Sequence, residues 1–92
     1  MRVDKLQALR KRLSAVNRRL LEDLNERLRL VSQARELKRE RGIAFHDAAR
    51  EAEMMRELLD ANEGPATAGE LRGVFKEIFA VSISHAQRSG KR

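Results

Sequence analysis

Apolar residues recur at helical spacing through most of the first 40 residues, and this stripe constrains the fold more than any other feature. A helix of about 36 residues is roughly 54 Å long, whereas a compact chain of 92 residues is only about 30 Å across. The helix must extend beyond any globule built by the rest of the chain, so its stripe needs further cover. A second copy of the chain is the simplest cover, because two-fold dimers are the commonest assemblies. The stripe consists of Leu6, Leu9, Leu13, Val16, Leu20, Leu24, Val31 and Ala34.

Glycine and proline divide the chain into three helical segments, over about 4–40, 48–61 and 68–88. Asp47 stands at the N-cap position of the second segment, and Thr67 with Glu70 has the pattern of a capping box before the third. Strand-like alternation is absent from the sequence. We therefore expect a single all-α domain over residues 1–92, with a long first helix, a basic tail at 88–92 and a homodimeric helical bundle.

The amino-acid composition limits the classes of function that this chain can have. The chain has no cysteine, which excludes disulfides and thiolate metal sites, and it lacks an apolar run of membrane-spanning length. Residues 1–41 hold 13 basic and 6 acidic side chains, a charge pattern that suits nucleic acid, a membrane surface or a small anion. With three phenylalanines and no Trp or Tyr, the chain offers few surfaces for stacking bases. We expect a cytoplasmic protein that binds neither nucleic acid nor a membrane.

Two cations lie on the apolar stripe itself. Arg27 and Lys38 are eleven residues apart, which is three turns plus about 20°, so they point the same way, and Arg10 sits at the edge of the stripe. A charge on a core-facing stripe is unfavourable unless it meets a partner. One interpretation is that these side chains reach solvent or pair with acids such as Glu51. The set as a whole favours a small polyanion bound between helices, because guanidinium and ammonium groups suit carboxylates.

The order of these residues resembles the all-helical, AroQ-type chorismate mutases, and more closely the mutase domain joined to some DAHP synthases. The resemblance covers about residues 5–87 and implies an intertwined homodimeric helical bundle, in which the long first helix pairs with that of the partner. It rests on Leu9-Arg10, Leu13-Ser14, Val16-Asn17, Glu26-Arg27, Lys38, Asp47, Arg50-Glu51, Gly64-Pro65 and Val74 to Phe79.

The resemblance implies roles for individual residues. Arg10 would reach into the partner subunit's site, and Arg27 would serve its own, so that the two arginines hold the two carboxylates of the substrate. Lys38 would contact the ether oxygen. Asp47 and Glu51 would contact the ring hydroxyl and nearby polar groups, with Arg50 beside them, and Ser82 corresponds to a serine that contacts the ligand.

One position departs from the family pattern. The family usually has Gln or Glu four residues after the serine, where this chain has Ala86, and Gln87 follows one residue later. Either the last helical turn is distorted and presents Gln87 to the ligand, or the ether oxygen relies on Lys38 alone.

The implied activity is the conversion of chorismate to prephenate in phenylalanine and tyrosine biosynthesis, an intramolecular Claisen rearrangement without metal or cofactor. The alternative is a regulatory domain that senses chorismate or prephenate for an attached DAHP synthase. A basic helical nucleic-acid binder is a third alternative, supported by charge only.

Overall fold

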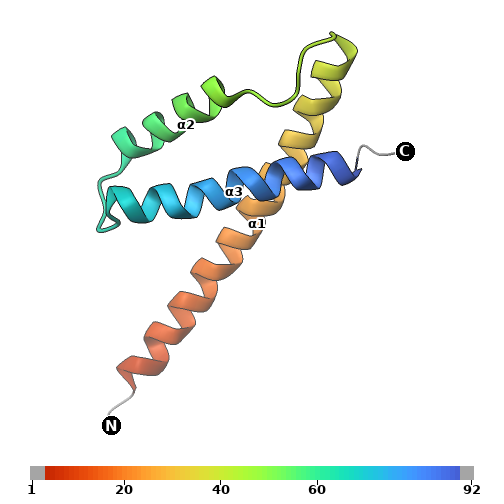
Figure 1. Cartoon of the computed structure of the whole chain (residues 1–92). Coiled ribbons are helices and arrows are strands. Elements are labelled where there is room, and N and C mark those ends of the chain that lie inside the picture. Colours follow the sequence, from red (N-terminus) through yellow and green to blue (C-terminus); the bar gives the residue numbers. More distant parts are fainter. Residues whose placement is uncertain (1–3, 90–92) are drawn as a thin grey trace.

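A computed structural model describes residues 4–89 as three helices: α1 (Lys5–Glu40), α2 (Ala48–Ala61) and α3 (Ala68–Ser89). Their bounds agree with the predicted segments to within a residue, and the chain is all-α as expected. The predicted tail at 88–92 lies largely outside the described residues. α3 crosses the C-terminal half of α1, and α2 lies along α3 (Figure 1).

Helix α1 ends because the chain makes a left-handed turn at Gly42, whose φ is +69°. The amide of Ile43 donates to the carbonyl of Lys38 at 2.8 Å, and the amide of Gly42 donates to that of Arg39 at 3.2 Å. This pair of bonds is the Schellman motif, in which glycine takes the left-handed position without a side-chain clash. The motif sends the chain away from α1 immediately after the turn that carries Lys38.

The other two helices begin at the caps that the sequence predicts. The Asp47 carboxylate accepts a hydrogen bond from the Arg50 amide at 3.0 Å. Thr67 and Glu70 bond reciprocally, each side chain accepting from the other's backbone amide, at 3.1 and 3.0 Å. These caps satisfy amides that have no partner inside the helix, so both helix starts are determined locally.

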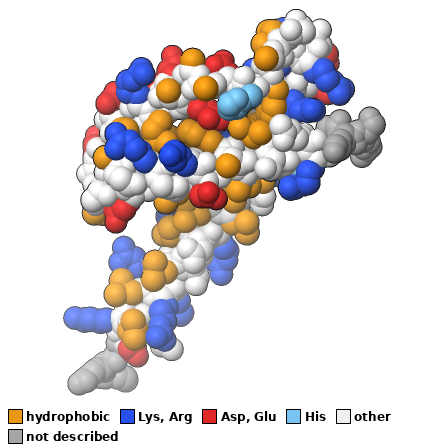
Figure 2. Space-filling view, viewed as in Figure 1, with side chains coloured by type: hydrophobic (Ala, Val, Ile, Leu, Met, Phe, Trp, Pro, Cys, Tyr) orange, Lys and Arg blue, Asp and Glu red, His pale blue; other side chains and the backbone are white. Residues whose placement is uncertain are grey.

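The fold leaves the N-terminal half of α1 projecting from the rest of the molecule (Figure 1). The described chain measures 64 × 30 × 15 Å, with a radius of gyration of 17.3 Å, against about 12 Å for a compact chain of this length. Leu6, Leu13 and Leu20 are 56%, 60% and 62% exposed. Figure 2 shows that apolar side chains on the projecting half of α1 are interspersed with Lys and Arg. The expected overshoot of the first helix is confirmed.

The buried core of the described residues is small and lies on α3. It consists of Phe79, Ser82 and Ala86, spaced three and four residues apart on one face. This face packs against α1 where the two helices cross, and it positions the pocket described next.

Candidate functional site

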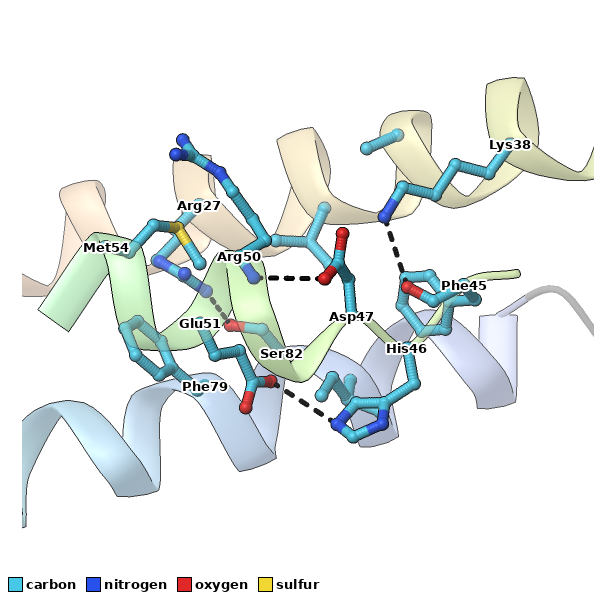
Figure 3. A pocket seen from close by; sticks show the side chains of 13 residues that line it. Arg27, Lys38, Phe45, His46, Asp47, Arg50, Glu51, Met54, Phe79 and Ser82 are labelled. Atoms are coloured by element: carbon cyan, nitrogen blue, oxygen red, sulfur yellow. Dashed lines mark hydrogen bonds and ion pairs between the residues drawn. The ribbon is translucent and has the colours of Figure 1, made fainter. Parts of the chain in front are cut away.

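A pocket of about 380 Å³ opens among the three helices and the α1–α2 loop (Figure 3). Such a volume suits a small organic ligand. Apolar side chains make up much of the wall, and charged groups from three segments enter it. The lining residues are Arg27, Val31, Ala34 and Lys38 from α1, Phe45 to Asp47 from the loop, Arg50, Glu51 and Met54 from α2, and Phe79, Ser82 and Ile83 from α3.

Arg27 is held by α3 and not by an acid. Its Nη1 donates to the Ser82 hydroxyl at 2.5 Å, and its guanidinium carbon lies 4.9 Å from the centre of the Phe79 ring. Partial burial lowers the pKa of Arg27, and the nearby charge of Glu51 opposes this shift. The guanidinium is therefore oriented and partly desolvated before any anion arrives.

Lys38 enters the same pocket three turns further along α1. Its Nζ donates to the backbone carbonyl of Phe45 at 3.1 Å. Within residues 4–89, neither Lys38 nor Arg27 has a carboxylate oxygen within 4.0 Å. Direct ion pairing, one of the two interpretations of these cations, is thus absent from the described part of the chain.

The acidic side of the pocket comes from the loop and the start of α2. Asp47 uses Oδ1 to cap the helix. Glu51 is half-buried, and its Oε2 lies 3.9 Å from Nε2 of His46. His46 lines the pocket although its side chain is 64% exposed. The sequence does not single out this histidine as a site residue, because a loop residue carries no periodic signal.

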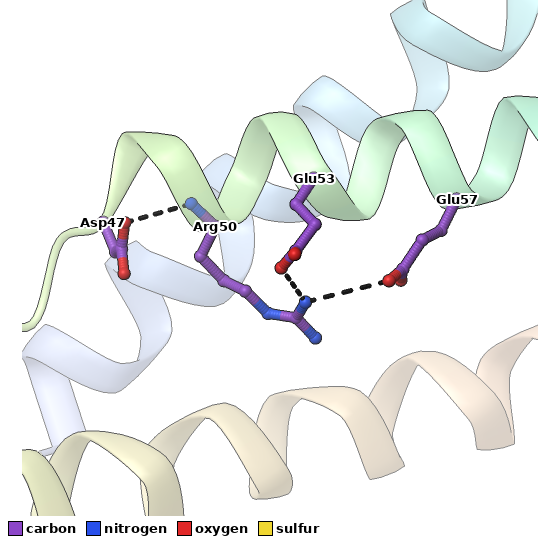
Figure 4. Close-up of polar contacts among 4 residues, drawn as sticks. All are labelled: Asp47, Arg50, Glu53 and Glu57. Atoms are coloured by element: carbon purple, nitrogen blue, oxygen red, sulfur yellow. Dashed lines mark hydrogen bonds and ion pairs between the residues drawn. The ribbon is translucent and has the colours of Figure 1, made fainter.

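Arg50 lines the pocket, but its guanidinium is directed towards acids on its own helix (Figure 4). Nη1 lies 2.5 Å from Glu53 and 4.0 Å from Glu57. The hydrogen bond to Glu53 is the main cause that raises the pKa of Arg50. Both side chains of the closer pair are about half exposed, so solvent weakens this interaction.

Two predicted site residues lie elsewhere. Arg10 lines a separate groove with Gln7, Lys11, Ser14 and Arg18, and 17 residues of continuous helix put it about 25 Å from Arg27 along the axis. Gln87 is exposed and does not line the pocket. Helix α3 continues to Ser89, so the last turn is not distorted to present Gln87.

Sequence reasoning also missed apolar members of the wall. Phe79 and Ile83 from α3, Met54 from α2 and Phe45 from the loop line the pocket but were not predicted as site residues. Phe45 could not be found from periodicity, because it lies in the loop. Among the described residues 4–89, no group of three or more His, Cys, Asp or Glu side chains could hold a metal ion.

Comparison with known proteins identifies the family. Residues 9–87 match the family described as chorismate mutase type II. The chain belongs to the type II chorismate mutases. Two solved structures of chorismate mutase from Thermus thermophilus share its fold. Form II is 41% identical with a TM-score of 0.89, covering 92% of this chain and 97% of that one. Form I is 43% identical with a TM-score of 0.84, covering 86% and 99%.

Two curated relatives in the family are larger. Bifunctional chorismate mutase/prephenate dehydratases of Stutzerimonas stutzeri and Pseudomonas aeruginosa are 27% and 28% identical over 89 residues. The match covers 91% of this chain and 24% of each relative, so the chain spans about a quarter of their length. None of the helices within residues 4–89 is long and apolar enough to cross a membrane.

Proposed function

We propose that this chain catalyses the rearrangement of chorismate to prephenate, using binding and electrostatics without a cofactor. The observation that carries the proposal is the pair of cations, Arg27 and Lys38, that enter a largely apolar pocket without an acid in ion-pair distance within the described chain. Charges left unneutralised in this way favour an anionic ligand. Family membership and the likeness to the two Thermus enzymes support chorismate as that ligand.

Arg27 would hold one carboxylate of the substrate. Its guanidinium is already fixed by Ser82 and Phe79, so little rotamer entropy is lost when the substrate binds. A fixed carboxylate helps to select the compact conformer in which the two reacting carbons are in contact, and such positioning lowers the barrier of an intramolecular reaction.

Lys38 would meet the negative charge that develops on the ether oxygen as the carbon–oxygen bond breaks. An ammonium group can donate three hydrogen bonds, and one is taken by the Phe45 carbonyl. Two N–H groups remain for the substrate. A donor aimed at charge that grows only in the transition state raises the rate of the chemical step.

The remaining polar residues would contact the ring substituents. Glu51 and Asp47 offer carboxylate acceptors for the ring hydroxyl. Ser82 orients Arg27 by accepting its hydrogen bond. Arg50 would contribute positive charge after its guanidinium turns from Glu53 towards the substrate. Gln87 has no place in the proposed pocket, which leaves the ether oxygen to Lys38.

We propose a homodimer with shared sites as the working form. Three cations and two carboxylates line the pocket, which leaves a net charge of one positive for a substrate with two carboxylates. Arg10 cannot supply the missing charge to its own pocket, because α1 is one continuous helix between Arg10 and Arg27. Arg10 of a second copy can supply it, provided that the exposed stripe of α1 packs against that copy.

The residues 1–92 would form one mutase domain, and the compartment would be the cytoplasm. The two curated relatives combine the mutase with a prephenate dehydratase, so they do not support a DAHP synthase as the attached domain. The regulatory alternative consequently has no observation in its favour beyond the sequence resemblance.

The direct test is to mix the purified chain with chorismate and to follow the loss of chorismate and the formation of prephenate. Lys38→Ala should abolish most of the turnover, whereas Lys76→Ala, at an exposed position of α3, should not. Saturable chorismate binding without prephenate formation would overturn the catalytic proposal in favour of a sensing domain.

A further inference from the structure

Within the loop between α1 and α2, Phe45 is the side chain that packs against cations of α1. Among residues 41–47, only Phe45 is half-buried, while the other six are exposed. Phe45 also provides the backbone carbonyl that accepts the hydrogen bond of Lys38. The position of this carbonyl therefore depends on how the Phe45 ring is held.

Two cations of α1 hold the ring. The guanidinium carbon of Arg35 lies 5.6 Å from the ring centre, and Nζ of Lys38 lies 5.9 Å from it. Both distances are within the range of cation–π attraction. The Nε of Arg35 is buried and has no hydrogen-bond partner among residues 4–89, and the guanidinium that carries it lies over the Phe45 ring.

The arrangement brings two like charges together beside one ring. Arg35 and Lys38 are three residues apart on one helix face, and like charges at this spacing repel. The electron-rich face of the ring and the Phe45 carbonyl lie where they can attract both cations. Lysine has a flexible four-carbon stem, and the carbonyl limits the positions that its Nζ can take.

We propose that Arg35 is a positioning residue for Lys38, acting through Phe45. Arg35 does not line the pocket, so its proposed effect on catalysis is indirect. It stacks on the ring, the ring holds the loop, and the loop carbonyl directs Nζ into the pocket. The inference rests on the proposed function, in which Lys38 meets the charge on the ether oxygen.

Steady-state kinetics test the proposal. Arg35→Leu keeps an apolar stem but removes the cation, and it should lower kcat by about three- to tenfold, the loss expected for one cation–π contact. KM should change less than kcat, because Arg27 still binds the carboxylate. Arg35→Lys should recover most of kcat. Arg39→Leu is the matched control, since Arg39 is exposed on the next turn and pairs with Glu36, and it should behave as the wild type.

A double-mutant cycle separates positioning from a general structural role. In a Lys38→Ala background, Arg35→Leu should change kcat by less than about twofold, because the group that it positions is gone. Equal losses with and without Lys38 would overturn the proposal. Phe45→Leu should reproduce the Arg35→Leu pattern, and it provides a second route if Arg35→Leu folds poorly.

A measurement without substrate keeps this inference distinct from the proposed function. In NMR spectra of the protein labelled with ¹⁵N-lysine, the ammonium protons of Lys38 should exchange with water more slowly than those of Lys76. The substitution Arg35→Leu should remove this difference in exchange rate. If exchange responds but chorismate is never converted, the positioning stands and the proposed function fails. If Lys38→Ala abolishes turnover while Arg35→Leu alters neither kcat nor exchange, only the positioning role is wrong.

Discussion

Arg27 donates a hydrogen bond of 2.5 Å to Ser82, a residue 55 positions further along the chain. The Ser82 hydroxyl donates in turn to the carbonyl of Ile78 at 2.7 Å. Because its single proton is engaged one turn back, the oxygen presents lone pairs to the guanidinium. Ser82 is only 1% exposed, so this acceptor is rigid, and it fixes the cation that we propose to bind the substrate.

Ser82→Ala should therefore weaken substrate binding while leaving the fold intact. A hydrogen bond to a charged group contributes about 1.5–3 kcal/mol, and we expect kcat/KM to fall by about tenfold or more, mainly through KM. Circular dichroism should show unchanged helix content. Ser84→Ala, at an exposed position of the same helix, is the control. Wild-type kinetics in Ser82→Ala would show that Arg27 needs no support from α3.

Lys38→Ala should affect the chemical step more than binding. Loss of one preorganised donor to a developing oxyanion lowers kcat by about 10²–10³-fold, and the loss should be larger here because Ala86 offers no second donor. Steady-state kinetics on chorismate give kcat and KM separately. A near-normal kcat in this variant would contradict the mechanism whatever the fold.

Arg27→Met should remove activity without lowering stability. Burial depresses the pKa of Arg27 in the folded chain, so desolvation of the charge opposes folding at every pH below that pKa and offsets the hydrogen bond to Ser82. Thermal unfolding should give a Tm equal to or above that of the wild type between about pH 6 and pH 9. Arg29→Met, at an exposed position of the same turn, controls for loss of surface charge. A clear fall in Tm for Arg27→Met alone would show that its contacts outweigh desolvation.

Mixing two inactive variants tests the shared site. Arg10→Ala and Arg27→Ala chains should each be inactive, but a heterodimer contains one site with both arginines intact. Co-refolding them should restore activity, approaching half of the wild-type value per heterodimer. If heterodimers form, as seen by native mass spectrometry, and stay inactive, Arg10 does not cross between subunits.

Gln87→Ala should change kcat by less than about twofold, because this side chain is exposed on a regular helix outside the pocket. Ala86 lies one turn beyond Ser82 on the same face and is 1% exposed. Ala86→Gln would place an amide on the pocket side, and kcat should rise if the amide is accommodated. Loss of turnover in Gln87→Ala, with no gain in Ala86→Gln, would mean that the end of α3 rearranges around the substrate.

The sequence by itself determined the features that depend on near neighbours. Helix α1 ends at the turn made by Gly42, and α2 and α3 begin at the caps made by Asp47 and Thr67; such signals act within a few residues. The alignment of Arg27 with Lys38 followed from helical periodicity alone. The excess length of the first helix likewise followed from its rise per residue.

Only the tertiary structure decided which groups meet. It placed Phe45 against Arg35 and Lys38, and loop geometry has no period that could reveal this contact. It turned Arg50 towards Glu53, and it left Arg10 and Gln87 outside the pocket of their own chain. Side-chain direction and helix crossing depend on packing between segments far apart in sequence, which no local pattern records. The long-range bond from Arg27 to Ser82 exists because α3 crosses α1 at that turn.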